Sequence, residues 1–187
     1  MEALVKQHKS IQEIEREHKQ VVLAQKDSAN FEVLYNEYHE QIFRFVYHRL
    51  ESKEQAFDIT SQVFMKALSN LSSYKFKGVP FSAWLYRIAL NELATFFKKN
   101  QSARTIDIDT VQLQNLANEI DEESLDDLYN KTIEAIGKLS EHEVLLIEMR
   151  YFENKPFKEI GDILSITENN AKVKVYRIVE KLQKLLK

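Results

Sequence analysis

The sequence predicts an all-α fold in which two small helical domains are joined by an acidic linker, the C-terminal domain containing a helix-turn-helix. Apolar residues recur at spacings of three and four over most of the 187 residues, as on one face of an amphipathic helix. The chain has only three Gly and two Pro, which leaves few of the residues that turns between strands require. The periodicity is lost around residues 100–121, and this interruption separates the two domains.

Composition limits the class of protein. Hydrophobic residues make up 44% of the chain and charged residues 29%, which is typical of a globular protein. With no Cys, disulfides and thiolate metal sites are excluded. No apolar run approaches the ~18 residues that span a membrane, and the N-terminal stretch MEALVKQHKSIQ lacks the apolar core of a signal peptide. We therefore expect a cytoplasmic protein without membrane insertion.

The net charge of −3 is unevenly distributed. Residues 31–99 carry nine basic and seven acidic side chains, and residues 138–187 carry ten and eight. Residues 100–137 carry two basic and nine acidic side chains, so the acidity lies between two mildly basic parts. The net charge therefore does not exclude nucleic-acid binding by either domain.

The first half of the chain is expected to form five helices. Residues 1–21 form a charged helical extension, and a second helix follows from about Gln20 to Lys26. The first domain, residues 22–99, contains three amphipathic helices that can bury a common core. The residues that mark these helices are Phe31, Leu34, Tyr35, Tyr38, Ile42, Phe45, Val46 and Arg49, then Ala56, Ile59, Val63, Phe64, Ala67, Leu68 and Leu71, and finally Phe81, Trp84, Leu85, Ile88 and Ala89.

The second domain, residues 122–187, follows the acidic linker of residues 100–121. One helix extends through Leu139, a second from Ser140 to about Phe152, and the helix-turn-helix occupies residues 156–186. In its first helix, the apolar face is Phe157, Ile160, Ile163 and Leu164. In its second helix, the apolar seam is Ala171, Val175, Ile178, Leu182 and Leu185.

The connection between these two helices supports the helix-turn-helix prediction. Gly161 lies where a crossing helix needs a small side chain, although Gly inside a helix costs about 1 kcal/mol relative to Ala. Ser165 and Ile166 form the turn, and Thr167 is a favourable N-cap. The second helix of such a motif lies in the major groove of DNA.

The outer face of the second helix is suited to DNA. It carries Asn169, Asn170, Lys172, Val173, Lys174, Tyr176 and Arg177. Amides can pair with adenine edges, Val173 can contact a thymine methyl, and Lys and Arg can hold phosphates. An ordinary helical hairpin with a solvated basic face is the alternative interpretation.

A second candidate surface combines aromatic and basic residues in the first domain. It comprises Tyr74, Lys75, Phe76, Lys77, Phe81, Trp84, Tyr86, Arg87, Phe96, Phe97, Lys98 and Lys99. Such residues suit single-stranded nucleic acid, whose bases stack on rings while cations follow the backbone. Phe81 and Trp84 lie on the apolar stripe and are interpreted as core residues. Lys75, Phe76 and Lys77, in the loop, are the better candidates for contact with unstacked bases.

The order of these parts resembles a bacterial RNA polymerase sigma factor of the short extracytoplasmic-function (ECF) type in the sigma-70 family. The resemblance covers about residues 22–187, and the absence of further regions between the two domains is typical of the ECF group. It is carried, in order, by FEVLYNEYHEQIFRFVYHRL, AFDITSQVFMKAL, FKGVPFSAWLYRIALNELATFFKK, the acidic linker and LSEHEVLLIEMRYFENKPFKEIGDILSITENNAKVKVYRI.

The resemblance implies that the protein binds core RNA polymerase, at its clamp helices and flap. The residues that match the docking helix are Asp58, Ile59, Gln62, Val63, Phe64 and Lys66. A typical member has Gln and Glu where this chain has Ser61 and Gln62, so a carboxylate is missing and weaker docking is implied. An anti-sigma factor is a further partner that the resemblance implies.

The resemblance also assigns two promoter surfaces, one for duplex DNA and one for the non-template single strand. Opening of the −10 element is implied for Lys75, Phe76, Lys77, Trp84, Arg87, Asn91 and Lys98. Recognition of the −35 element is implied for Thr167, Glu168, Asn169, Asn170, Lys172, Val173, Lys174 and Arg177. Many relatives have Asp and Arg where this chain has Thr95 and Lys98, and a Lys lacks the bidentate geometry of Arg. The acidic linker is similar to the segment that threads toward the polymerase active centre.

No enzymatic activity, cofactor or metal is expected. The five His form no metal-ligand constellation, and neither a nucleophile elbow nor a phosphate-binding Gly loop is present. Two other functions remain as alternatives to the sigma factor: a helix-turn-helix regulator that binds duplex DNA without polymerase, and a helical adaptor that binds only proteins.

Overall fold

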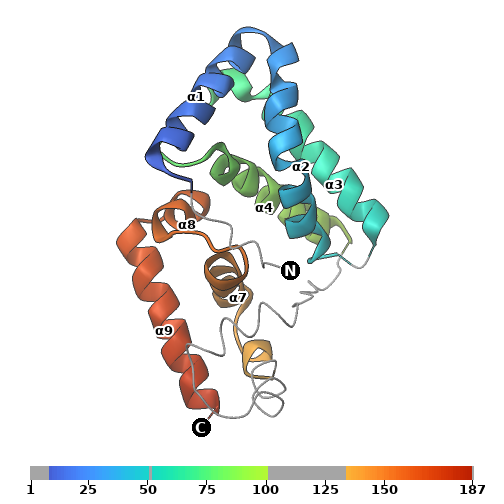
Figure 1. Ribbon diagram of the computed structural model, residues 1–187. Coiled ribbons are helices and arrows are strands. Elements are labelled where there is room, and N and C mark those ends of the chain that lie inside the picture. Colours follow the sequence, from blue (N-terminus) through green and yellow to red (C-terminus); the bar gives the residue numbers. More distant parts are fainter. Residues whose placement is uncertain (1–8, 51, 101–133, 187) are drawn as a thin grey trace, which may run out of the picture. The chain divides into compact units, whose positions relative to one another are not determined.

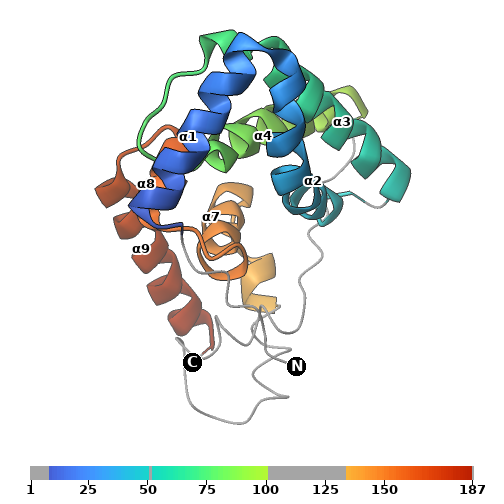
Figure 2. The ribbon, with the colours of Figure 1, turned by 45° about the horizontal axis from the view of Figure 1, so that its top comes forward.

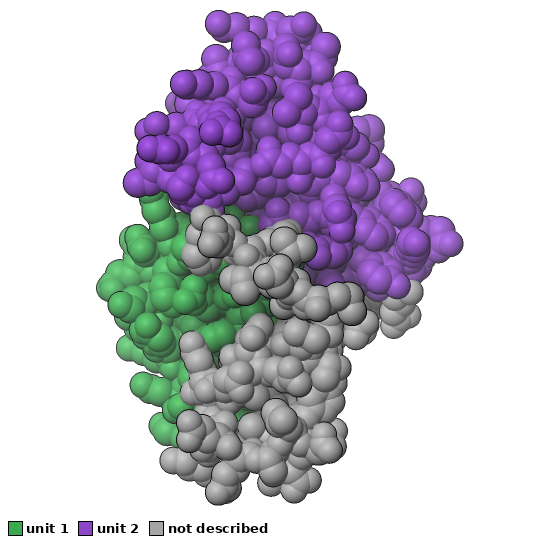
Figure 3. All heavy atoms as spheres, viewed as in Figure 1, with its two compact units in different colours: residues 1–8, 108–187 green, residues 9–107 purple. Residues whose placement is uncertain are grey.

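The computed structural model, shown in Figure 1, describes residues 9–50, 52–100 and 134–186. The regular structure within these ranges is helical and contains no strand, as predicted for an all-α fold. The chain divides into two compact units, coloured separately in Figure 3. Of the described residues, 9–50 and 52–100 form the N-terminal unit and 134–186 form the C-terminal unit. The predicted linker, residues 100–121, lies outside the described residues except for Asn100.

Four helices build the N-terminal unit: α1 (Ile11–Lys26), α2 (Phe31–Tyr47), α3 (Lys53–Ser69) and α4 (Phe81–Asn100). Helix α3 packs against α2 and α4, and α1 packs against the same two helices. Figure 2 shows α1 and α2 as a hairpin on one side of α4. The core formed between them is apolar, and its largest fully buried side chains are Leu34, Ile42, Phe45, Phe81, Leu85 and Tyr86.

Helix α1 is one continuous helix, whereas the sequence predicted two helices with a break near Gln20. Its start is fixed by a capping box: the Ser10 hydroxyl accepts from the Glu13 N–H (3.3 Å), and the Glu13 carboxylate accepts from the Ser10 N–H (2.7 Å). Val21 and Ala24 are buried against the unit, which anchors the second half of the helix. Residues 1–8 of the predicted extension lie outside the described residues.

The ends of α2 and α3 differ slightly from prediction. Helix α2 ends at Tyr47, and Arg49 folds back so that its guanidinium lies 3.6 Å over the Phe45 ring and donates to the Phe45 carbonyl (2.7 Å). Arg49 is therefore buried by capping the helix rather than by continuing it. Helix α3 ends at Ser69, and Leu71 contributes to the core from a 3-10 turn.

The C-terminal unit is described from residue 134, so the first part of the helix predicted from residue 122 lies outside the described residues. A helical turn at 134–137 precedes α7 (Glu141–Ile147), which continues into a π-helical turn (Glu148–Phe152). The helix-turn-helix then follows as α8 (Phe157–Leu164) and α9 (Glu168–Leu186). Helix α9 packs against both α7 and α8.

The predicted seam of α9 is buried at Ala171, Val175, Ile178 and Leu182. Leu185, which was predicted to continue it, is 39% exposed, because it lies in the last turn beyond the covered part of the helix. No helix in the described parts of the chain has the length and apolar character needed to cross a membrane.

Candidate nucleic-acid interfaces

The turn of the helix-turn-helix lies at Ser165 and Ile166, where the sequence predicted it. Helix α8 ends where Ser165 adopts a left-handed conformation (φ 57°, ψ 40°), and the Ile166 N–H donates back to the Gly161 carbonyl (2.9 Å). The Thr167 hydroxyl accepts from the Asn170 N–H (3.2 Å), which confirms Thr167 as the N-cap of α9.

Gly161 is required by close approach of the backbone. A Cβ placed there would lie 2.8 Å from the carbonyl oxygen of Ile166 and 3.2 Å from the Glu168 nitrogen. The prediction of a small residue is confirmed, but the crowding comes from the main chain of the turn, whereas a crossing helix was expected. Because main-chain atoms of a tight turn cannot rotate away, any larger residue must move the start of α9.

Replacement of Gly161 by Ala is expected to destabilise the C-terminal unit by up to about 2 kcal/mol. Overpacking costs about 1–3 kcal/mol, of which the better helix propensity of Ala offsets about 1 kcal/mol. Gly137→Ala is the matched control, because a Cβ at Gly137 would meet nothing within 4 Å. Urea unfolding followed by circular dichroism measures both variants. Equal unfolding midpoints for the two variants would contradict the expectation.

Helix α9 presents the predicted −35 residues together on its outer side. Seven of the eight are exposed, and Lys174 is half-buried beside the seam; the exposed ones are Thr167, Glu168, Asn169, Asn170, Lys172, Val173 and Arg177. The same helix buries Ala171 and Val175 on its inner side. Polar and basic side chains are thus held outward by a helix whose rotation is fixed by packing.

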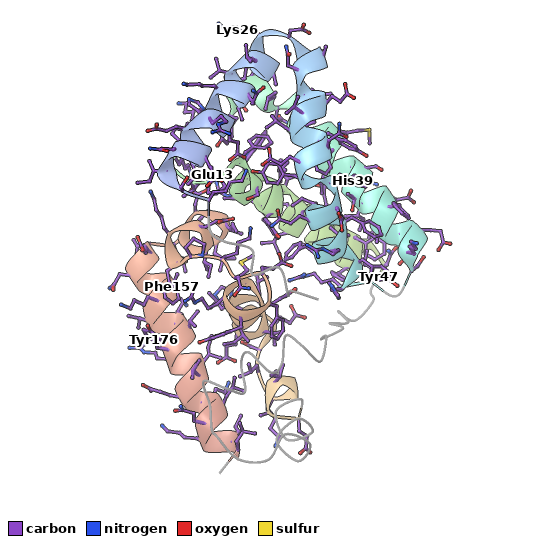
Figure 4. All side chains as sticks on the ribbon, in the orientation of Figure 1. Glu13, Lys26, His39, Tyr47, Phe157 and Tyr176 are labelled. Carbon is purple, nitrogen blue, oxygen red and sulfur yellow. The ribbon has the colours of Figure 1, made fainter. Side chains whose placement is uncertain are left out.

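Three further side chains, those of Tyr176, Phe157 and Arg150, extend this surface. Figure 4 labels Tyr176, on the outer side of α9, and Phe157, at the start of α8; their ring centroids are 6.0 Å apart. The Arg150 guanidinium lies 4.7 Å over the Phe157 ring, and the Lys172 ammonium lies 5.8 Å over the Tyr176 ring. The predicted −35 residues include none of these three, although Tyr176 was placed on the outer face of the second helix. The outward spacing of Tyr176 was visible in the sequence, but the position of Arg150 depends on the π-helical turn.

The predicted strand-opening loop connects the 3-10 turn to α4. Lys75, Phe76 and Lys77 are all exposed, and Gly78 has a positive φ of 67°, which Gly adopts without strain. The Phe76 ring, 37% exposed, is stacked on the His18 ring of α1, with centroids 4.2 Å apart and planes 10° apart. One face of the Phe76 ring is therefore already covered by the protein.

Helix α4 continues this surface. Phe81 is buried, as the core interpretation predicted, whereas Trp84 is only half-buried. The Trp84 ring lies 5.1 Å from the Tyr74 ring and 5.4 Å from the Phe81 ring. Arg87 is half-buried, and the remaining predicted residues, Asn91 and Lys98, are exposed at spacings that keep them near the same face.

Comparison with known families identifies both units. Residues 34–103 match Sigma-70 region 2, and residues 129–182 match Sigma-70, region 4. The chain belongs to the sigma-70 family. It is of the ECF type, as two relatives indicate: the ECF RNA polymerase sigma factors BldN of Streptomyces coelicolor and SigW of Bacillus subtilis. The family predicted from the sequence is confirmed.

The similarity to these sigma factors extends over most of the chain. BldN is 29% identical over 158 residues, which are 82% of this chain but 59% of BldN, so the chain spans less than two thirds of that relative. SigW is 29% identical over 185 residues, which are 93% of this chain and 97% of SigW. The solved structure of CnrH in complex with the cytosolic domain of CnrY has the same fold, with a TM-score of 0.58 and 18% identity over 91% of this chain and 96% of that one.

In this sigma factor, the predicted polymerase-binding residues of α3 divide between core and surface. Ile59, Val63 and Phe64 are buried by the unit itself. Asp58, Gln62 and Lys66 are exposed, and the Lys66 ammonium pairs with the Glu92 carboxylate of α4 (2.6 Å). The large apolar side chains that α3 exposes are Phe57 (44%), Met65 (60%) and Leu68 (41%). The predicted polymerase-binding residues include none of them, and Leu68 was placed on the apolar stripe of the core.

An aromatic row on α2 adjoins this surface of α3. Tyr35, His39, Phe43 and Tyr47 follow one another at intervals of four residues, with neighbouring ring centroids 4.8, 6.4 and 5.7 Å apart. Figure 4 labels His39 and Tyr47 along the helix. Phe57 of α3 stacks on Phe43 at 4.4 Å, which joins the two helices into one surface.

Four carboxyl groups of the described residues have shifted pKa values: those of Glu13 and Glu54, lowered by hydrogen bonds at their helix starts, and those of Glu17 and Glu143. Burial raises the pKa of Glu17 on α1, and hydrogen bonds from Tyr38 and Phe81 and the charge of Lys9 only partly oppose this. The hydrogen bond from Lys181 lowers the pKa of Glu143 at the start of α7. No group of acidic and His residues in the described ranges is arranged to hold a metal ion.

Proposed function

We propose that this ECF sigma factor is a dissociable subunit of RNA polymerase that recognises the −35 and −10 promoter elements and opens the duplex. The observation that supports it most directly is the pair of exposed nucleic-acid surfaces, one in the region-2 unit and one in the region-4 unit. Such a subunit needs no covalent chemistry, because binding free energy alone drives the opening. Its work with RNA polymerase places it in the cytoplasm.

In this proposal, α9 reads the −35 element in the major groove. The amides of Asn169 and Asn170 lie in its first turn, where recognition helices contact base edges. Lys172, Lys174 and Arg177 contact phosphates or guanine edges. The Thr167 cap and the crowded Gly161 fix where the helix begins, and therefore which side chains reach the bases.

The loop around Phe76 and the outer side of α4 open the −10 element. Unstacking a base costs a few kcal/mol, which a stacking and hydrogen-bonding site must offset. The exposed face of Phe76 and the half-buried Trp84 supply stacking, while Arg87 and Asn91 supply hydrogen bonds. Lys75, Lys77 and Lys98 hold the displaced backbone.

Core polymerase binds the N-terminal unit through Asp58, Gln62 and Lys66 with the apolar Phe57, Met65 and Leu68. Charged groups around exposed apolar side chains are the composition expected of a docking interface. An anti-sigma factor is a second partner in this proposal. It is supported by the solved structure of CnrH, a protein that shares this fold, in complex with the cytosolic domain of CnrY.

The test is run-off transcription with the host core polymerase on host genomic fragments. We expect transcripts that start at discrete sites only when this protein is present, and sequencing them gives both promoter elements. Core polymerase alone is the control. Absence of start sites dependent on the protein would refute the proposal, and specific gel-shift binding at submicromolar concentration without polymerase would favour a stand-alone helix-turn-helix regulator instead.

A further inference from the structure

Helix α1 contacts the strand-opening loop at its beginning and in its middle. The Gln25 side-chain amide donates to the carbonyls of Leu71 (2.9 Å) and Tyr74 (3.2 Å), where the loop begins. Seven residues earlier on the helix, His18 stacks on Phe76 in the middle of the loop. Residues seven apart lie on the same side of a helix, so one side of α1 follows the loop.

The end of the loop is held by Glu17. Its Oε1 accepts from the backbone N–H of Phe81 (3.0 Å), the first residue of α4, at a sequence separation of 64 residues. That N–H has no partner within its own helix, and the start of a helix favours a carboxylate. The Tyr38 hydroxyl also donates to Glu17, and the Lys9 ammonium lies 3.3 Å from its other oxygen. This buried carboxylate thus joins α1, α2 and α4.

We propose that Glu17, His18 and Gln25 of α1 are positioning residues that hold the loop of residues 71–81 ready to capture a displaced base. The inference rests on the function proposed above for Phe76 and α4. Helix α1 precedes residues 34–103, which match Sigma-70 region 2, so the match itself assigns these residues no role.

The physical benefit is preorganisation. A loop that is ordered only when DNA binds loses conformational entropy in that step, which weakens capture. Here the loop is held at both ends, and His18 covers one face of the Phe76 ring while the ring remains 37% exposed. A displaced base stacks on the uncovered face and extends a stack that the protein has already begun.

The contact itself is tested without DNA, by amide hydrogen exchange of the full chain measured by NMR. In Glu17→Ala we expect the Phe81 amide to exchange at least about tenfold faster than in the natural protein, since a hydrogen bond to a charged group is lost. Glu17→Gln retains a carbonyl acceptor and restores protection. Glu15→Ala, which removes an exposed carboxylate from the same helix, is the matched control. Unchanged exchange of Phe81 in Glu17→Ala would overturn the proposal.

The consequence is tested at a promoter obtained from the run-off experiment. Duplex opening is measured by the permanganate reactivity of thymines on two promoters, one with the natural −10 element and one in which the captured base is replaced. The quantity compared between variants is the opening of the first promoter divided by the opening of the second. We expect this ratio to fall about tenfold in Glu17→Ala and to return to the natural value in Glu17→Gln. A smaller fall is expected in Gln25→Ala, because the exposed Gln25 side chain can be removed without disturbing the hydrophobic core. Gln12→Ala is the control for Gln25→Ala.

A general loss of folded protein lowers opening on both promoters equally and leaves the ratio unchanged, so an unchanged ratio in Glu17→Ala and in Gln25→Ala overturns the proposal. If the natural protein with core polymerase opens neither promoter, the proposed function fails. The hydrogen-exchange result still decides whether α1 holds the loop.

Discussion

Transcription from the cognate promoter is expected to be abolished when Lys172, Lys174 and Arg177 are replaced together by Ala. These cations lie on the outer side of α9, where Lys172 and Arg177 are exposed and Lys174 is half-buried. Loss of each base or phosphate contact costs about 1 kcal/mol or more, so promoter binding weakens by about 10²- to 10⁴-fold. The slope of log K against log salt is expected to fall by up to about 3, because fewer counterions are released.

The measurements are run-off transcription and promoter binding of the reconstituted holoenzyme over a range of salt concentrations. Lys184→Ala is the control, because Lys184 is an exposed cation on the same helix in its last turn, away from the predicted contacts. Association with core polymerase, measured by size-exclusion chromatography, is expected to be unchanged in both variants. A triple variant that still initiates at the natural level would show that α9 is not the −35 reader and would favour the protein-binding adaptor.

Removal of Phe76 and Asn91 together, as Phe76→Ala with Asn91→Ala, is expected to reduce open complexes about 100-fold. Stacking of one base on an aromatic ring contributes about 1–3 kcal/mol, and a side-chain hydrogen bond contributes about 1 kcal/mol more. Closed complexes are expected to form normally, since the −35 contacts are intact. On a template with a pre-opened −10 bubble, the double variant should regain most of its transcription activity, because the protein no longer has to supply the free energy of unstacking the bases.

The matched control is Val33→Ala with Asn36→Ala, which removes an apolar and an amide side chain from exposed positions of α2. Permanganate reactivity measures opening, and gel shift of the holoenzyme measures closed complexes. Equal opening by the double variant and the natural protein would exclude the Phe76 surface from strand opening. A parallel loss of both complexes would indicate damage to the N-terminal unit instead.

Local features of this fold were predictable because their causes are local. The Thr167 hydroxyl caps α9 by accepting from the N–H of Asn170. Ser140 and Glu143 form a capping box that starts α7 where a helix was expected. The same Ser-x-x-Glu pattern occurs at Ser10 and Glu13, and it predicts a helix that starts at Ile11, as α1 does.

Features that depend on packing from more than one side were not predictable from periodicity. On the predicted apolar stripe of α3, which packs against both α2 and α4, Ile59 and Val63 are buried as expected, whereas Leu68 is 41% exposed. Periodicity marks an apolar stripe but not which part of a wide stripe its neighbours cover. The contact between Glu17 and Phe81 is less predictable still, since no local pattern relates residues so far apart in the sequence.

Helix α1 holds the loop through hydrogen bonds to main-chain atoms, and this affects which amino-acid substitutions the loop can accept. Gln25 binds the carbonyls of Leu71 and Tyr74, and Glu17 binds an N–H that any residue except Pro provides at position 81. Side chains between these points can therefore be exchanged while the loop keeps its anchors. On our proposal, the chain can acquire a preference for a different −10 base by substitutions in the loop alone, which makes this loop a natural position for engineering altered promoter choice.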